Sequence, residues 1–123
     1  MELLVVDCEI RPDAVLVRAK GEVDSVTVNQ LVAQLDAGLK AAATHTARLL
    51  IIDLRALTHF GSAGLTAVLE CHRQGIQTRT SVRLVADNNL VVRVLQVTNM
   101  DSVLELYRTV SDALEASHPG TEW

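Results

Sequence analysis

Residues 48–54, which read Arg-Leu-Leu-Ile-Ile-Asp-Leu, decide the fold class of this chain. Leucine and β-branched residues follow one another there without the polar alternation of a half-exposed strand. Such a run predicts a strand that is buried on both faces, as parallel strands are. A helical pattern follows over 63–74, and Gly75 is expected to end that helix. Its core-facing positions are predicted to be Leu65, Val68, Leu69 and His72.

Towards the N-terminus, two apolar strand patterns flank a short turn. Residues 3–10 and 14–20 read as strands, so we expect an antiparallel hairpin. The segment Gly-Glu-Val-Asp at 21–24 is expected to end the second strand. Thr27 and Gln30 have the spacing of a capping box, which predicts the start of a helix. The buried stripe of that helix is predicted to hold Val28, Leu31, Leu35 and Leu39.

Towards the C-terminus, strand and helix patterns continue to alternate. The expected elements are strands at 80–86 and 103–107 and helices at 89–97 and 109–116, the first helix capped by Asn88 or Asn89. Strands that alternate with helices predict an α/β fold with a mixed, mostly parallel sheet of four to five strands and about four helices. We expect 1–117 to form a single domain and 118–123 to be a flexible C-terminal tail.

Composition excludes several classes of protein. The chain of 123 residues carries a formal net charge of −4, and its 11 lysines and arginines are scattered, which argues against direct nucleic-acid binding. No segment approaches the roughly 20 apolar residues of a membrane span, and the N-terminus does not resemble a signal peptide. Cys8 and Cys71 have no metal or redox spacing. These features predict a cytoplasmic protein with reduced, structural thiols.

Ser62 stands where the buried strand gives way to the helix, in a segment 54–65 that reads Leu-Arg-Ala-Leu-Thr-His-Phe-Gly-Ser-Ala-Gly-Leu. Its hydroxyl is therefore expected at a helix N-terminus, where unpaired N–H groups and the helix dipole favour negative charge. Two interpretations follow. Ser62 is either a helix N-cap, the commonest role of serine at this position, or a site of phosphorylation.

Enzymatic use of Ser62 has little support in the sequence. A hydrolase nucleophile elbow reads G-x-S-x-G, but Phe60 occupies the first glycine position and would crowd the strained turn. The glycines form no phosphate-binding loop, and the histidines and cysteines lack the ligand spacing of a zinc site. Asp24 and Asp53 are expected at strand ends, where aspartate often caps a turn. We therefore expect no catalytic residue, no metal and no cofactor.

Three blocks of sequence share a pattern with one known family. They are Gly-Glu-Val-Asp at 21–24, the segment from Ile52-Asp53-Leu54 to Phe60-Gly61-Ser62-Ala63-Gly64-Leu65, and the closing elements at 73–75, 82–85 and 94–98. Together, over about residues 3–116, they resemble the STAS family, the sulfate-transporter and anti-sigma-factor-antagonist domains. The middle block is the most specific, because it lies between a buried strand and a helix.

The resemblance implies a stand-alone bacterial anti-sigma factor antagonist that regulates transcription by partner switching, as in stress responses. In that family the serine matching Ser62 is phosphorylated by an anti-sigma factor that is also an ATP-dependent serine kinase. The unphosphorylated antagonist binds the anti-sigma factor and frees a sigma factor, and a serine phosphatase resets the cycle. Asp24 matches an acidic residue near the phosphorylation site. Neither direct nucleic-acid contact nor membrane insertion is implied.

One position departs from the family pattern. Gly61 stands where the family commonly has an aspartate before the serine. The glycine removes a like charge beside a phosphate on Ser62, and it also removes a possible contact for the kinase. The residues expected to bind the partner are Asp24, Gly61, Ser62, Ala63, Gly64 and Thr66. A STAS binding module that is not phosphorylated, acting as a scaffold or a transporter-associated regulatory subunit, remains the alternative.

Overall fold

The computed structural model describes residues 3–116 and is built around one five-stranded sheet. The strands are β1 (Leu4–Ile10), β2 (Val15–Val23), β3 (Leu49–Phe60), β4 (Ser81–Val85) and β5 (Glu105–Tyr107), and they lie in the sheet in this order. β1 pairs with β2 in antiparallel fashion, and the other three pairings are parallel. The predicted α/β fold with an N-terminal hairpin and a mostly parallel sheet is confirmed.

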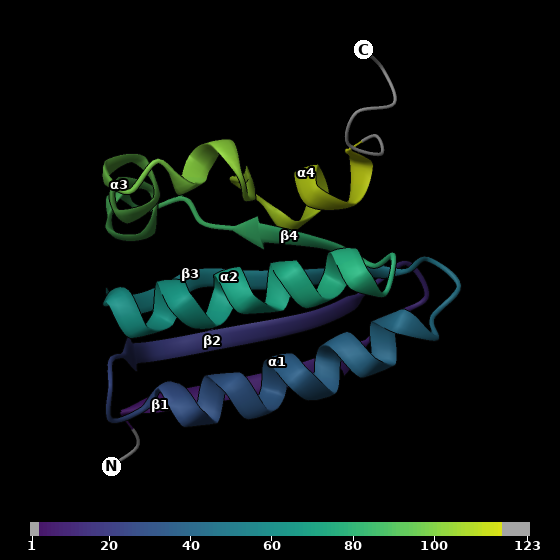
Figure 1. The fold of residues 1–123 in the computed structure, drawn as a ribbon, viewed down its shortest axis with the longest axis horizontal. Coiled ribbons are helices and arrows are strands. Elements are labelled where there is room, and N and C mark those ends of the chain that lie inside the picture. The colour runs from purple at the N-terminus through teal and green to yellow at the C-terminus, as the bar shows by residue number, and fades with distance from the viewer. Residues whose placement is uncertain (1–2, 117–123) are drawn as a thin grey trace.

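The two long helices α1 (Val28–Ala43) and α2 (Ser62–Gln77) lie side by side on one face of the sheet (Figure 1). Each connects two neighbouring parallel strands, and both connections step across the sheet in the same direction. Because such crossovers are almost always right-handed, both helices must cover the same face. We call this face the helix face, and the opposite one the rear face.

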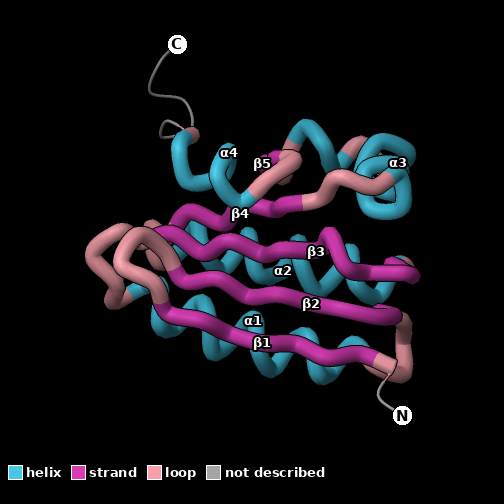
Figure 2. The backbone as a smooth tube through the Cα atoms, turned by 180° about the vertical axis from the view of Figure 1, so that it is seen from behind, coloured by secondary structure: helices cyan, strands magenta, loops and turns pink. Residues whose placement is uncertain are grey.

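The C-terminal elements complete the sheet and part of its rear face. α3 (Asn89–Val97) and a 3₁₀ turn (Met100–Ser102) connect β4 to β5, and α4 (Val110–Glu115) follows. Seen from behind, α4 lies at one end of the rear face, and no helix lies in front of β1, β2 or the distal half of β3 (Figure 2). One functional consequence is that charged side chains on these strands remain accessible.

Two apolar cores hold the layers together. The larger one fills the space between the sheet and the helix face, with Val17, Leu50 and Ile52 facing Leu31 and Leu35 of α1. The smaller core lies under α4 on the rear face and consists of Ala14, Leu16, Leu49, Ile51, Val85 and Ala113. The side chains of residues 49–52 therefore point alternately into the smaller and the larger core, which explains the uninterrupted apolar run in the sequence.

Some predicted boundaries are wrong. β2 does not end at 21–24 but runs through Gly21 to Val23, since Gly21 adopts a φ of 114° that continues the strand past an irregular register. β3 extends six residues past Leu54 because its distal half pairs with the end of β2. Gly75 does not end α2; it is a buried helical residue, and the helix continues to Gln77.

The cap of α1 also differs from the prediction. Thr27 is the N-cap residue of α1, but its hydroxyl makes no capping bond to the helix. It donates instead to the carbonyl oxygen of Glu22 at 2.8 Å and accepts from the N–H of Asp24 at 3.1 Å. The Thr27–Gln30 capping box is therefore absent, and the threonine ties the helix start to the end of β2.

The remaining predictions concern the caps of the later helices, the two cysteines and the C-terminal tail. The cap predicted for α3 is present, since Asn88 accepts from Val91 N–H. Thr109 caps α4 by accepting from Asp112 N–H, which was not predicted from the sequence. Cys8 is exposed and Cys71 is buried, and both are free thiols. The predicted C-terminal tail at 118–123 lies outside the described residues.

Candidate functional site

Ser62 is the first residue of α2, and its side chain is exposed. The N-cap residue is Gly61, whose backbone is extended (φ −89°, ψ −176°), so the interpretation of Ser62 as the N-cap is wrong. Glycine has no side chain to accept a bond from the first turn, and none of the described residues supplies a side-chain cap in its place. The first turn of α2 therefore presents N–H donors beside an exposed hydroxyl.

Two small neighbours give access to this hydroxyl. Ala63 is half-buried, and Thr66 lies one turn further along α2 with its side chain exposed. The Thr66 hydroxyl donates to the carbonyl oxygen of Ser62 at 3.0 Å, so it is engaged by the helix itself. Ser62 is thus the outward hydroxyl at the tip of the helix.

Gly64 fixes the position of the helix start. It is buried, and a Cβ atom at this position would lie 2.8 Å from both Phe60 and Val23. The absence of a side chain lets α2 approach the ends of β2 and β3. Gly64 was predicted to contact the partner, but its burial assigns it a packing role that holds Ser62 in place.

The Asp24 carboxylate lies in the turn that leads into α1. Its Oδ1 atom accepts from the N–H of Thr27 at 3.0 Å and of Val26 at 2.8 Å. These bonds lower the pKa of Asp24 below its usual range, the Thr27 bond most, and the neighbouring His59 lowers it further. The carboxylate is therefore ionised at neutral pH and is fixed in orientation by the backbone.

A main-chain hydrogen bond joins the two halves of the site. The N–H of Gly61 donates to the carbonyl oxygen of Val23 at 3.0 Å, one residue before Asp24. The structure therefore brings the predicted site residues together at the end of the sheet where β2 and β3 leave it. The resulting surface, formed by Asp24, Gly61, Ser62, Ala63 and Thr66, is called the Ser62 surface below.

Sequence reasoning missed two residues at this surface. Val26 is 80% exposed at the tip of the Asp24 turn. The Nε2 atom of His59 lies 3.4 Å from the point where a Cβ of residue 61 would be. The place of His59 in the sequence, three residues before Ser62 and next to the expected helix start, could have suggested an electrostatic role.

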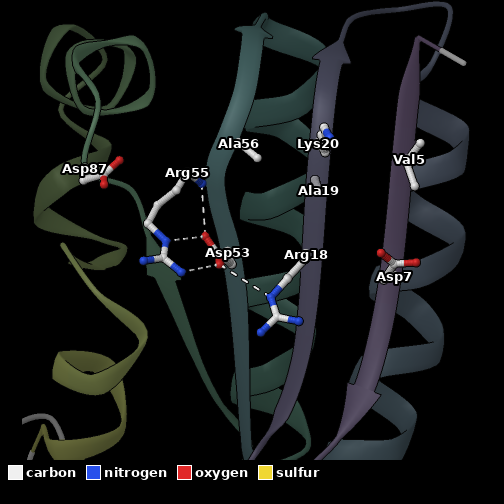
Figure 3. A pocket seen from close by; sticks show the side chains of 9 residues that line it. All are labelled: Val5, Asp7, Arg18, Ala19, Lys20, Asp53, Arg55, Ala56 and Asp87. Carbon is white, nitrogen blue, oxygen red and sulfur yellow. Dashed lines mark hydrogen bonds and ion pairs between the residues drawn. The ribbon is translucent and has the colours of Figure 1, made fainter.

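Asp53 was predicted to lie at the end of a strand, and that prediction is wrong. It does not join the Ser62 surface either. It lies within β3 on the rear face, 6% exposed, where Arg55 binds it through Nε at 3.0 Å and Nη2 at 2.9 Å. Arg18 approaches it to 3.9 Å. These side chains line an open groove of about 460 Å³ between β1 and the Asp87 loop (Figure 3). Asp53 is thus part of a structural ion pair.

Two further features of the described residues bear on the class of site. Within residues 3–116, no cluster of three or more histidine, cysteine, aspartate or glutamate side chains could hold a metal ion. Over the same residues, no helix has both the length and the apolar character needed to cross a membrane. What the Ser62 surface offers is an exposed hydroxyl, helix N–H donors and a fixed carboxylate.

Comparison with known families identifies the fold. The family model of the STAS domain matches residues 5–113 of the chain. The chain belongs to the STAS domain family. The resemblance predicted from the three sequence blocks is confirmed over nearly the whole chain.

Solved structures agree with this assignment of a STAS domain. An anti-sigma factor antagonist from Mycobacterium paratuberculosis is 27% identical with a TM-score of 0.81, over 90% of this chain and 91% of that one. A STAS domain protein from Planctomyces limnophilus is 22% identical with a TM-score of 0.71, over 89% and 93% of the two chains. The phosphorylated form of the Bacillus cell fate determinant SpoIIAA is 19% identical with a TM-score of 0.66, over 90% and 97%. STAS domains of this kind are generally binding modules rather than enzymes.

Proposed function

We propose that this STAS domain is an anti-sigma factor antagonist that is switched off by phosphorylation of Ser62. The observation that carries the proposal is an exposed serine hydroxyl at the uncapped N-terminus of α2, on a fold similar to that of solved anti-sigma factor antagonists. In its unmodified form, the Ser62 surface binds an anti-sigma factor and thereby releases a sigma factor. The protein itself performs no catalysis.

The chemistry of the switch is a phosphoryl transfer carried out by the partner. The Ser62 hydroxyl oxygen forms a bond to the γ-phosphorus of ATP held by the anti-sigma factor, the bond from that phosphorus to the β,γ-bridging oxygen breaks, and ADP leaves. The hydroxyl proton passes to a base on the kinase. A serine phosphatase later hydrolyses the ester and restores the hydroxyl.

Electrostatics explain how the phosphate would weaken partner binding. Phosphorylation adds about −1.5 to −2 charges at neutral pH. The N-terminus of α2 tolerates this charge in the free protein, because its N–H donors and helix dipole face it. A docked partner would have to desolvate the phosphate next to the ionised Asp24. We expect a loss of roughly 5- to 150-fold in affinity, the usual scale of such couplings.

Gly61 is compatible with this proposal. It places no carboxylate beside the phosphate, and His59 lies next to it instead. An imidazole ring carries no negative charge, so this neighbour of Gly61 adds no repulsion to a phosphate on Ser62. The solved structures of SpoIIAA in unphosphorylated and phosphorylated forms support the idea that this fold accommodates the modification.

The first test is the intact mass of the protein purified from its native cells. We expect one added phosphoryl group on the wild type and none on Ser62→Ala. Ser25→Ala is the matched control, because Ser25 is an exposed serine in the neighbouring Asp24 turn. If no modified species appears under growth or stress, or if it persists in Ser62→Ala, the phosphorylation switch is wrong.

A second test separates binding from modification. Co-purification of the unmodified protein is expected to yield a kinase-type anti-sigma factor, and Ser62→Asp is expected to reduce its recovery. Recovery of a transport ATPase or a scaffold component would instead favour a STAS module that binds without being phosphorylated. Equal capture by Ser62→Asp and wild type would contradict the proposed electrostatic mechanism.

A further inference from the structure

β1 is an edge strand that lacks several of the features that usually prevent pairing. It lies at one end of the sheet, carries no proline, and pairs with β2 in an unbroken register from Leu4 to Ile10. Three of the large apolar side chains that remain exposed belong to it or directly precede it: Leu3 (49%), Val5 (42%) and Ile10 (68%). Natural edge strands are usually interrupted, shortened or covered to prevent association.

The pairing with β2 determines which backbone N–H and C=O groups of β1 face away from the sheet. The carbonyl oxygen of Leu3 accepts from Glu22 N–H, and Arg11 N–H donates to the carbonyl oxygen of Ala14, both at 2.8 Å. Because hydrogen-bonded and non-hydrogen-bonded pairs alternate along an antiparallel ladder, odd-numbered residues of β1 bond towards β2. The outward-facing backbone groups therefore belong to Leu4, Val6, Cys8 and Ile10.

We propose that a second copy of this chain pairs with β1 through these groups, so that two sheets join into one around a two-fold axis at Val6. Antiparallel self-pairing in which the outward groups bond one another uses at least three of these residues of each copy when it centres on Val6, Asp7 or Cys8. Centring on Cys8 places Asp7 opposite Glu9 of the second copy, which sets like charges against each other. Centring on Asp7 places two carboxylates directly opposite, which is unfavourable. Centring on Val6 places Asp7 opposite Val5 and Leu4 opposite Cys8 of the second copy.

The charges on the rear face favour the Val6 register. Lys20 lies opposite Val5 in the β1–β2 ladder, and it makes no ion pair with any other residue in the described part of the chain. In the joined sheet, Asp7 of the second copy lies beyond Val5, two strands or about 10 Å from Lys20. The long lysine side chain spans most of that separation. Each dimer contains two such pairs of opposite charge.

The helix face is also compatible with this arrangement. α1 contacts both β1 and β2, so in the joined sheet the axes of the two α1 helices would lie about 10 Å apart, a normal packing distance. The groove between α1 and β1 is lined by uncharged residues only: Leu4, Val5, Val6, Gln30, Ala33 and Gln34. Small and neutral side chains on α1 permit this approach. β3, which leads to Ser62, is two strands away from the joined edge.

Sedimentation equilibrium of the full chain tests the proposal directly. Over about 5 to 500 µM, a range that covers weak association, we expect a monomer–dimer equilibrium in the wild type. Val5→Asp should weaken the dimer about tenfold, because it places two new carboxylate pairs opposite each other. Val5→Lys should not weaken it, because the new ammonium groups face Asp7. Val5 is partly exposed, and circular dichroism of both variants checks that they fold.

Cross-linking tests the register. In a Cys8→Ser background, oxidation of mixed Val5→Cys and Asp7→Cys proteins should give a disulfide-linked dimer, because these positions lie opposite each other in the Val6 register. Either variant alone should remain mostly uncross-linked. A wild type that is monomeric throughout, a dimer that Val5→Asp leaves intact, or cross-linking of Asp7→Cys alone would each overturn the proposal.

Discussion

At the scale of single residues, the glycines around Ser62 have different roles. Gly61 has an extended backbone and open space, since an added Cβ would meet only His59 at 3.4 Å and a carbonyl oxygen at 3.7 Å. Gly64 has no such space. The sequence pattern around Ser62 predicted that both residues belong to the site. It could not separate an exposed N-cap from a buried packing position, because that difference depends on where Phe60 and Val23 lie.

The two glycines predict opposite outcomes for the same substitution. Gly64→Ala should lower the free energy of unfolding by about 1–3 kcal/mol, because its methyl group overlaps Phe60 and Val23. Gly61→Ala should cost less than about 1 kcal/mol, the scale of a weakened N-cap. Urea denaturation of both variants measures the difference. Equal losses would contradict the packing role of Gly64.

Asp24 predicts a pH dependence of stability. Its pKa is lowered in the folded protein, so its ionised form stabilises the fold above the unfolded-state value of about 3.9. That contribution is lost as the pH falls through the lower, folded-state pKa. Asp24→Asn keeps an acceptor oxygen but cannot titrate. The melting temperature of the wild type should therefore fall more steeply than that of Asp24→Asn between about pH 5 and pH 3. Parallel curves would disprove this role.

At the scale of elements, the sequence predicted which strands and helices exist better than where they end. Residues 55–60 have a mixed composition, and they extend β3 only because β2 pairs with them. Position 75 lies inside α2, and it holds a glycine because a Cβ there would lie 2.7 Å from Val82 and 2.8 Å from the carbonyl oxygen of Thr80. Such close approaches between distant segments leave no local signal, so a glycine was read as a helix end.

Gly21 provides a test of how β2 is held to its neighbours. It adopts a φ of 114°, and a Cβ at this position would collide with the carbonyl group of Leu3. Gly21→Ala is expected to destabilise the protein by about 2 kcal/mol or more through backbone strain and the displacement of β1. Thermal unfolding measures the loss, with Glu22→Ala as an exposed control in the same strand. A variant as stable as the control would contradict this account.

The packing of α2 also predicts the reactivity of its cysteine. Burial raises the pKa of Cys71 to about 12, with a smaller contribution from Asp36. Since the thiolate is the reactive form, Cys71 should resist iodoacetamide at pH 8 in the folded protein and react after denaturation. Mass spectrometry of the Cys8→Ser variant isolates this thiol. Rapid labelling without denaturant would show that α2 opens readily.

At the scale of the whole molecule, the sequence predicted the layers, the hairpin and the family, because these follow from the order of apolar patterns. It did not predict the link between the C-terminal elements and the sheet. Arg83 is buried in β4, donates to the carbonyl oxygen of Ala113 in α4 at 2.6 Å, and lies 3.3 Å from Glu105 of β5. A lone arginine in an apolar strand gives no hint of these two partners, which come from later elements of the chain.

Arg83 should therefore control the stability of the C-terminal part. Replacing it with methionine keeps the bulk but removes the charge-assisted bonds, at a cost of about 2 kcal/mol. Hydrogen exchange should accelerate at residues 105–115 and stay unchanged at residues 49–54 in the central strand. Arg93→Met, an exposed arginine on α3, is the control. Uniform acceleration across the sheet would show that these elements do not unfold separately.

The uncapped start of α2 has one more consequence for the molecule as a whole. Gly61 leaves the first-turn donors of α2 without a side-chain acceptor, so a negative charge attached to Ser62 would find them available. The same charge that would weaken a complex would raise the melting temperature of the free protein. Phosphorylation would then lower the affinity for the partner while it raises the melting temperature of the free protein. Calorimetry of the isolated protein could therefore distinguish the modified from the unmodified form before any partner is known.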